Sequence, residues 1–366
     1  MTREMRGIKE KNDNNEWRYL EVREKEVIRC NSIHSTLVDG MVKGISPNTV
    51  FLEECPGYVL SLGRNQCCEE ECDIVECEKL GITIERRETG GGAGLMVPGS
   101  TSWGICMDKR DSSVSDDMDR NFEILSRGVI TGLKKLGLDA VFAPINDINI
   151  GDKKVGGMTA MTRQNSLLIY GSVIWDFDMD IFMKIARIPA PKLKKKGVSS
   201  VQKRITTIIQ ELGRKIPPAE LRDCLIQGFE EALSVKLTKA GLNEAENAIW
   251  NKKMDIFSSK KFILRPGHCS VSNVSCVYPA EKGIIRVSLF VNEGKIMDSG
   301  ITGDFMQIND IDFDPLEGLL VGAKTDREDI ERIVYTYFDE NDIQMVGASA
   351  DDFVDAIVGA VNEYEE

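Results

Sequence analysis

The sequence predicts a two-domain α+β protein. Short strand-like and helix-like stretches follow one another irregularly, without the strict strand–helix–strand order of a doubly wound parallel sheet. The chain has 366 residues, more than the roughly 250–300 that one hydrophobic core usually supports. A charged, irregular stretch near residues 251–261 suggests a boundary. We therefore expect a polar N-terminal lead at 1–16, a larger domain at 17–252 and a smaller domain at 260–366.

The elements of the larger domain are predicted from apolar spacing and from the residues that end each run. Six apolar residues recur at helical spacing before Gly137, which ends that helix, and Pro217 and Pro218 open another. The predicted strands are 58–62, 82–85, 102–107, 147–150, 154–155 and 166–175, and the predicted helices are 69–80, 122–136, 179–186 and a last one from Pro217.

The smaller domain begins with a predicted hairpin. Strand-like stretches at 284–291 and 295–301 are joined by Asn292-Glu293-Gly294, which favours a three-residue loop. Helical patterns follow from about Pro315, from Asp326 and from Ala350.

The net charge of −13 argues against a nucleic-acid partner, because phosphate backbones are bound by clustered basic residues. Residues 181–210 are an exception, with eight basic residues and no acidic one, so they are either a local anion site or a solvated loop. The sequence has no run of about 18 apolar residues, so it predicts no membrane span. The polar N-terminus lacks an apolar signal-peptide core, so we expect a cytoplasmic protein.

Ten cysteines without a secretion signal favour reduced thiols over a disulfide framework. Cys67, Cys68, Cys72 and Cys77 cluster, but they lack the paired spacing of a zinc knuckle. We favour buried thiols over a metal site here.

The most informative stretch is Arg86-Arg87-Glu88-Thr89-Gly90-Gly91-Gly92-Ala93, directly after a predicted strand. Consecutive glycines let a backbone approach a ligand closely and present N–H groups to an anion, and the arginines add charge. The spacing matches neither a P-loop nor a dinucleotide-binding fingerprint. A glycine-rich hairpin without a ligand is the alternative.

A second stretch, residues 146–157, predicts a hairpin with Gly151 in its turn and Lys154 on the returning strand. Lysine is rarely buried without a partner. A lysine followed by Val155 and two glycines in an apolar hairpin therefore suggests a carboxylate or phosphate partner. Exposure on the other strand face is the alternative.

These stretches together resemble the lipoate–protein ligase A family in its long form. The shared motifs, in order, are Gly63-Arg64-Asn65-Gln66, the glycine-rich loop, Asn146-Asp147-Ile148 followed by Lys154-Val155-Gly156-Gly157, and residues 196–204 (KGVSSVQKR). Gly303-Asp304-Phe305 and Pro315-Leu316-Glu317 resemble the family's C-terminal accessory domain. The resemblance covers nearly all of the chain from Trp17.

The resemblance implies a mixed-sheet catalytic domain of the biotin/lipoate ligase type with a smaller α+β accessory domain. It also implies that the protein adenylates lipoic acid with ATP and Mg²⁺ and transfers the lipoyl group to a lysine of a lipoyl carrier domain. That carrier would be a 2-oxoacid dehydrogenase acyltransferase subunit or a glycine cleavage H protein, with no nucleic-acid or membrane partner.

Lys154 matches the family's catalytic lysine, which contacts the acid and the phosphoryl group, and Asp147 is a candidate ligand of Mg²⁺ through water. The expected substrate and ATP site consists of Arg86, Arg87, Thr89, Gly90, Gly91, Gly92, Ala93, Asn146, Asp147, Gly156, Gly157, Lys196, Gly197, Val198, Ser199, Ser200 and Val201.

Two family motifs are altered. Where the family has a His-Asp pair after the glycine-rich loop, this chain has Met96 and Val97, and where it has His-His-Gly-Thr, this chain has Ile169-Tyr170-Gly171-Ser172. Adenylation needs no general base, because the attacking carboxylate is ionised at neutral pH. Three interpretations therefore remain: a working ligase, a ligase for a related acid or carrier, and a weakened carrier-binding paralogue.

An octanoyl or lipoyl transferase of the same fold is a further alternative. An acyl-enzyme requires a nucleophilic thiol near the lysine hairpin, and no cysteine lies between Cys106 and Cys224. The sequence therefore favours the ligase.

Overall fold

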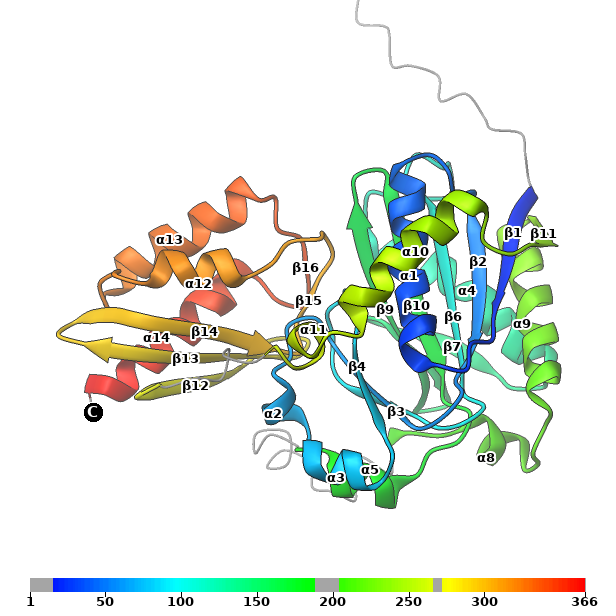
Figure 1. The fold of residues 1–366 in the computed structure, drawn as a ribbon, viewed down its shortest axis with the longest axis horizontal. Coiled ribbons are helices and arrows are strands. Elements are labelled where there is room, and N and C mark those ends of the chain that lie inside the picture. The colour runs from blue at the N-terminus through cyan, green and yellow to red at the C-terminus, as the bar shows by residue number, and fades with distance from the viewer. Residues whose placement is uncertain (1–15, 188–203, 266–271, 366) are drawn as a thin grey trace, which may run out of the picture.

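The fold is given by a computed structural model that describes residues 16–187, 204–265 and 272–365. A larger body contains the N-terminal part of the chain, and the last hundred or so residues form a smaller body beside it (Figure 1). No helix in the described ranges is long and apolar enough to cross a membrane.

The larger body is built on one eight-stranded mixed sheet with the strand order β11-β1-β2-β6-β10-β9-β8-β7. β1 is parallel to both β11 and β2, and the remaining pairs are antiparallel. The predicted mixed sheet is therefore confirmed. The strands are β1 (Glu16–Val22), β2 (Thr49–Glu54), β6 (Thr101–Asp108), β7 (Ala140–Ala143), β8 (Asp147–Ile150), β9 (Lys153–Arg163), β10 (Ser166–Val173) and β11 (Lys236–Lys239).

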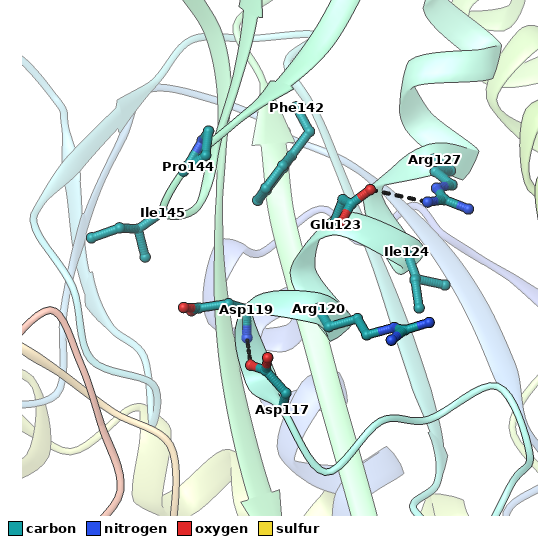
Figure 2. A pocket seen from close by; sticks show the side chains of 9 residues that line it. All are labelled: Asp117, Asp119, Arg120, Glu123, Ile124, Arg127, Phe142, Pro144 and Ile145. Atoms are coloured by element: carbon teal, nitrogen blue, oxygen red, sulfur yellow. Dashed lines mark hydrogen bonds and ion pairs between the residues drawn. The ribbon is translucent and has the colours of Figure 1, made fainter.

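A groove of about 650 Å³ runs along the β7 edge of this sheet (Figure 2). Its walls are the first turns of α4 (Met118–Lys135), with Arg120 and Glu123, and Phe142 and Ile145 from the end of β7 and the turn after it. Ile145 directly precedes Asn146, so the groove borders the lysine hairpin without containing Lys154.

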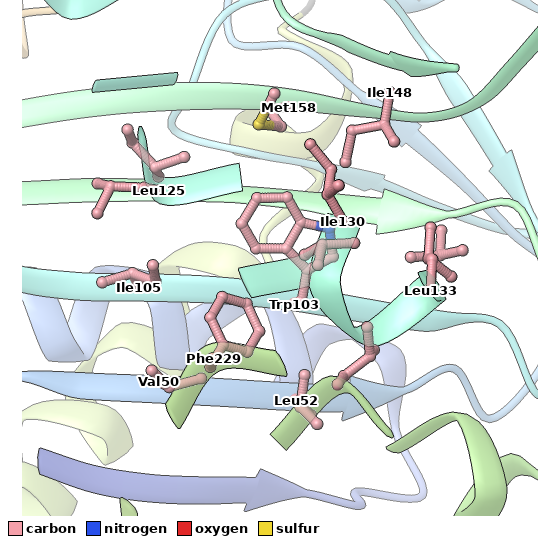
Figure 3. Packing of buried hydrophobic residues seen from close by; sticks show 14 of the residues in the cluster. Val50, Leu52, Trp103, Ile105, Leu125, Ile130, Leu133, Ile148, Met158 and Phe229 are labelled. Carbon is pink, nitrogen blue, oxygen red and sulfur yellow. The ribbon is translucent and has the colours of Figure 1, made fainter. Parts of the chain in front are cut away.

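One face of the sheet packs against α4 and α9 (Pro218–Leu233), with Trp103 and Phe229 in contact at the centre of the core (Figure 3). As predicted, Pro218 opens α9 and Gly137, at φ +86°, follows the end of α4. The short helix α8 (Ile208–Leu212) adds Ile208 to this core.

The opposite face packs against α1 (Val27–Val42) and α10 (Glu244–Phe257). A fully buried carboxylate on α10, Glu246, forms an ion pair with Arg18 of β1 at 2.6 Å. The stretch near 251–261, predicted to be irregular, is mostly helical, because Asn243 and Glu246 cap α10 and Trp250 and Phe257 are buried. That prediction was wrong.

A small sheet, β4-β3-β5, stands beside the main sheet, and the glycine-rich loop joins two of its strands. The sequence predicted one helix at 69–80, but Cys72 and Asp73 divide it, and Asp73 caps the second half by accepting from the Glu76 N–H. The elements are β3 (Val59–Leu62), β4 (Thr83–Arg86), β5 (Gly94–Met96), α2 (Cys68–Glu71), α3 (Ile74–Lys79) and α5 (Met179–Ile185).

The smaller body follows the short helix α11 (Lys260–Leu264). Its antiparallel sheet β12-β13-β14 packs against three helices around Phe305, Phe313 and Phe353. The predicted hairpin is present, but its loop has two residues, Glu293 and Gly294, both at positive φ, rather than three. The elements are β12 (Val274–Pro279), β13 (Ile284–Asn292), β14 (Lys295–Gly303), β15 (Met306–Gln307), α12 (Asp314–Leu320), α13 (Arg327–Glu340), β16 (Met345–Val346) and α14 (Ala350–Glu365).

The two bodies share apolar packing. Met306, Ile308 and Val346, from the segments that form β15 and β16, belong to the same core cluster as Trp103. The predicted domain limits of 17–252 and 260–366 remain predictions, since this shared packing does not define a boundary residue by residue.

Candidate active site

The glycine-rich loop is held in shape by Arg87. The Arg87 guanidinium donates to the carbonyl oxygens of Ser61 at 2.9 Å, Gly90 at 3.2 Å and Gly92 at 2.9 Å. Arg86, the preceding residue, is only 1% exposed. Both guanidinium groups hold backbone carbonyl oxygens together.

Arg86 makes four donor contacts to carbonyl oxygens. They reach Gly63 at 2.8 Å, Arg64 at 3.0 Å, and Phe262 and Ile263 at 2.9 Å each. Burial, together with the positive charge of Arg265, lowers the pKa of Arg86 to about 10. The geometry therefore surrounds Arg86 with backbone carbonyl oxygens, and its contact with a ligand remains a prediction.

Two hydrogen bonds fasten the loop to the main sheet. The hydroxyl groups of Thr89 and Tyr170 are hydrogen-bonded at 2.9 Å, and the Thr159 hydroxyl donates to the Gly90 carbonyl at 3.2 Å. Burial raises the pKa of Tyr170, so its phenol stays protonated. The loop thus lies on the face of the sheet formed by β9 and β10.

Lys154 lies on the same face. Its Nζ donates to Asp147 Oδ1 at 2.9 Å, across the hairpin of β8 and β9. A bulge opposite Ile148 and Asn149 lets Val155 enter the core while Lys154 points toward Asp147. The sequence-based expectation of a carboxylate or phosphate partner is met by Asp147.

Glycine at position 157 leaves room for the ammonium. A Cβ there would lie 2.8 Å from Lys154 Nζ and 3.6 Å from Asp147 Oδ1. Gly157 and Thr159 are two residues apart on β9, so their positions share one face of the strand. The lysine hairpin and the glycine-rich loop therefore border one polar surface.

Asn146 completes the edge of this surface. Its side-chain amide is buried and donates to the Met158 carbonyl, while its Oδ1 has no hydrogen-bond partner among the described residues. An unused buried acceptor next to two charged side chains is a candidate contact for a ligand hydroxyl or amino group.

The predicted loop of Lys196, Gly197, Val198, Ser199, Ser200 and Val201 lies outside the described residues. The chain that follows it runs beside the lysine hairpin, because the Thr206 N–H donates to the Lys154 carbonyl at 2.9 Å.

The Gly63-Arg64-Asn65-Gln66 turn contacts the smaller body, hereafter the accessory body. Arg64 forms ion pairs with Asp310 and, at 2.9 Å, with Asp312, and the Asn65 amide donates to Gln307 at 2.6 Å. The Gly91 N–H donates to the Phe305 carbonyl at 3.0 Å. The accessory body therefore touches the glycine-rich loop directly.

The sequence pattern did not identify two residues of this surface. Thr159 lies two positions after Gly157, a period-two spacing that could have suggested it. Lys282 of the accessory body has Nζ 3.6 Å from Asp147 Oδ1, and only the packing of the two bodies brings it there.

The cysteines lie elsewhere in the fold. Cys68, Cys72 and Cys77 are buried free thiols that pack with Leu60 and Ile82 beneath the small sheet, as predicted. Cys67 is disulfide-bonded, so the prediction of a reduced thiol was wrong at that position. Cys106 is fully buried in β6, and burial raises its pKa to about 12. Cys224 is on α9, across the main sheet from Lys154, so neither thiol lies in the described part of the site.

Two family models match the chain. The lipoyl protein ligase A/B catalytic domain matches residues 31–230, and the bacterial lipoate protein ligase C-terminus matches residues 278–357. The chain belongs to the lipoyl protein ligase A/B family, in the form that carries this C-terminal domain. The family resemblance expected from the sequence is thereby confirmed.

The named relatives include both lipoate–protein ligases and octanoyltransferases. The chain is 26% identical to lipoate–protein ligase 1 of Staphylococcus aureus over 279 residues, which cover 75% of this chain and 81% of that protein. It is 28% identical to the lipoate-protein ligase LplJ of Bacillus subtilis over 320 residues, covering 82% and 89%. It is also 23% identical to the octanoyltransferase LipM of Clostridioides difficile over 267 residues, covering 68% and 98%.

Solved structures share the fold. The match to LipL1 of P. falciparum in complex with lipoate covers 89% of this chain and 98% of LipL1, with a TM-score of 0.67 and 17% identity. A lipoate-protein ligase A bound with ATP covers 69% of this chain and 98% of its own, with a TM-score of 0.58 and 22% identity. The biotin/lipoate ligase-like fold expected from the sequence is confirmed.

Proposed function

We propose that the protein is a lipoate–protein ligase that adenylates lipoic acid, or a closely related acid, with ATP and transfers the acyl group to a lysine of a carrier domain. Family membership over both matched segments supports the ligase. The observation that carries the proposed site is the Lys154 ammonium, 2.9 Å from Asp147 and on the sheet face that holds the glycine-rich loop.

The first step joins two anions. A carboxylate oxygen of the acid attacks the α-phosphorus of ATP, a new C–O–P linkage forms, and the bond to the β-phosphate breaks with its electron pair leaving on pyrophosphate. Lys154 lowers the barrier by holding a positive charge where the acid and the phosphate meet. Its partner Asp147 fixes the ammonium before substrates arrive, so little reorganisation is required during the reaction.

The second step forms an amide. The carrier's lysine amine attacks the acyl carbon, AMP departs as the leaving group, and the amine proton passes to solvent. The residues of the chain hold the adenylate, and the glycine-rich loop presents backbone N–H groups to its phosphate. Neither step requires a thiol.

Mg²⁺ fits this surface as an ion carried in with the nucleotide. Such ions usually keep several waters and take one or two protein carboxylates in addition to phosphate oxygens. Asp147 is the carboxylate that would face the ion, and when bound Mg²⁺ would neutralise charge on the phosphates. The proposed carriers are lipoyl domains of 2-oxoacid dehydrogenase complexes or the glycine cleavage H protein.

The bound ligands of the structural neighbours support the choice of substrates. One neighbour holds lipoate and another holds ATP. A third is described as a bi-partite lipoate protein ligase of Thermoplasma acidophilum together with its E2 lipoyl domain. This support concerns the fold, since each of the three is below 25% identical to the chain.

The test is acid-dependent exchange of pyrophosphate into ATP, measured for lipoate, octanoate and biotin. We expect exchange with lipoate or octanoate, followed by a mass increase on a purified lipoyl domain that disappears when its acceptor lysine is replaced by arginine. Absence of exchange with all three acids would refute the ligase and leave the transferase and the carrier-binding paralogue.

An octanoyl transferase is the second candidate, because LipM proteins are among the relatives. It predicts ATP-independent acyl transfer between carrier domains through a thioester that hydroxylamine cleaves. An acylated enzyme that resists hydroxylamine, or no acylated enzyme at all, excludes this candidate.

A further inference from the structure

A second lysine reaches Asp147 from the accessory body. Lys282 lies in the turn between β12 and β13, and its Nζ is 3.6 Å from Asp147 Oδ1. Lys154 Nζ is 2.9 Å from the same oxygen atom. One carboxylate oxygen is therefore shared by two ammonium groups that come from different parts of the chain.

The backbone around Lys282 is fixed by hydrogen bonds. The Lys282 N–H donates to the Gly347 carbonyl at 2.7 Å, beside β16. The Ile284 N–H, two residues later, donates to Asp304 Oδ1 at 2.6 Å. The turn is thus anchored on both sides, and the lysine is directed toward Asp147 by a rigid support.

The charges around Asp147 come from both bodies. Two ammonium groups face this one carboxylate, and a second carboxylate, Asp304, acts on Lys282. The side chains of Lys154 and Lys282 are 39% and 35% exposed, so both are open to a ligand. Burial lowers the pKa of Lys282, Asp147 and Asp304 raise it, and the nearby Lys154 lowers it. An anion that bound here would meet two ammonium groups at once.

We propose that Lys282 is a second phosphate-binding lysine, which contacts the β- and γ-phosphates of ATP while Lys154 meets the α-phosphate and the acid. The inference rests on the proposed ligase function. Two ammonium groups that share one oxygen are close enough to meet neighbouring phosphates of one triphosphate. In the adenylation step the breaking bond sends its electron pair to pyrophosphate, and Lys282 stabilises that charge.

The assignment gives Lys282 a role in only one half of the reaction. Lipoyl-adenylate has no β- or γ-phosphate, so its use by the enzyme should not depend on Lys282. A lysine that only docked the accessory body would instead affect both halves alike, because docking also sets the Gly91 contact with Phe305.

The experiment compares Lys282→Ala, Lys282→Arg and the control Lys295→Ala. Lys295 is an exposed lysine of the same body at the tip of the β13–β14 hairpin. Loss of a charge-assisted contact predicts that Lys282→Ala raises the KM for ATP in lipoate-dependent exchange by about tenfold or more. In Lys282→Ala, the KM for lipoate and the rate of transfer from preformed lipoyl-adenylate to a carrier should stay within about twofold of the wild type. Lys282→Arg should recover part of the loss, and Lys295→Ala should match the wild type.

Calorimetric titration with ATP separates this inference from the proposed function. Weaker ATP binding by Lys282→Ala supports the phosphate site even if the wild type shows no exchange, in which case the ligase function fails alone. Unchanged ATP affinity and KM overturn the inference, as does an equal loss in the arginine and alanine variants. An equal loss in exchange and in transfer from lipoyl-adenylate also overturns it, since that result indicates a docking role.

Discussion

Lys154→Ala should separate chemistry from folding. The ion pair with Asp147 joins side chains that are 39% and 24% exposed, and pairs of this exposure contribute less than about 1 kcal/mol. Removing Lys154 does not leave Asp147 alone, because Lys282 Nζ lies 3.6 Å from the same oxygen. We therefore expect the melting temperature to fall by less than about 3 °C.

The effect on adenylation should be far larger. Loss of one preorganised group that stabilises transition-state charge typically reduces the rate by about 10²–10³-fold. The assay is lipoate-dependent exchange of pyrophosphate into ATP at saturating ATP, alongside thermal melts of the same preparations. Lys153→Ala is the matched control, because Lys153 is the exposed neighbour on β9 and should retain wild-type exchange.

Two results would refute the reasoning. Exchange within about threefold of the wild type would show that the ammonium does not act at the reacting atoms. A melting temperature lowered by about 10 °C or more would show that Lys154 is a structural residue whose charge supports the hairpin.

Three further changes test the surroundings of the site. Gly157→Ala should displace the Lys154 ammonium and reduce exchange about tenfold with little change in melting temperature, because its Cβ would meet the flexible end of that side chain at 2.8 Å. Gly156→Ala should instead lower the melting temperature, because its Cβ would lie 2.8 Å from a backbone carbonyl oxygen of β10. Arg86→Met should destabilise the protein by about 3 kcal/mol or more, measured by urea unfolding, since buried carbonyl groups lose their donor. Burial raises the pKa of Glu85 from 4.5 to about 8, so its contribution to stability is complete below about pH 4.5 and is lost as pH rises through 8. Glu85→Gln should therefore unfold at higher urea than the wild type at pH 8.5 and at nearly the same urea at about pH 4.

The parts of the site that could be predicted from sequence are those encoded locally. Strand β8 has the predicted bounds, Gly151 takes the predicted turn position at φ +59°, and Lys154 has the kind of partner that a half-buried lysine requires. Each of these features depends on residues within one hairpin, so a short window of sequence contains the information.

The parts that were missed depend on contacts between distant segments. Strand β9 was predicted as two residues but runs over Lys153–Arg163, because cross-strand pairing with β10 overrides the weak strand preference of Gly156 and Gly157. Helix α1 was not predicted, since α10 and the sheet bury it on nearly all sides, including His34 and Thr36, which removes the polar face that gives a helix its period. Arg86 was expected in the ligand site, and only the fold shows that its neighbours are backbone carbonyls.

The altered histidine motifs are consistent with this chemistry because adenylation requires positive charge more than proton transfer. Tyr170, in the position of the family's second histidine, is buried, and its hydroxyl group contacts Thr89 of the glycine-rich loop. A protonated phenol there supports the loop and is not expected to act as a base. The charged groups that we propose to face the reacting anions are Lys154 and Lys282, and neither belongs to a histidine motif. The substitutions should therefore change which acid fits more than whether an acid can be activated. We expect their effect to appear in the rank order of acids in the exchange assay.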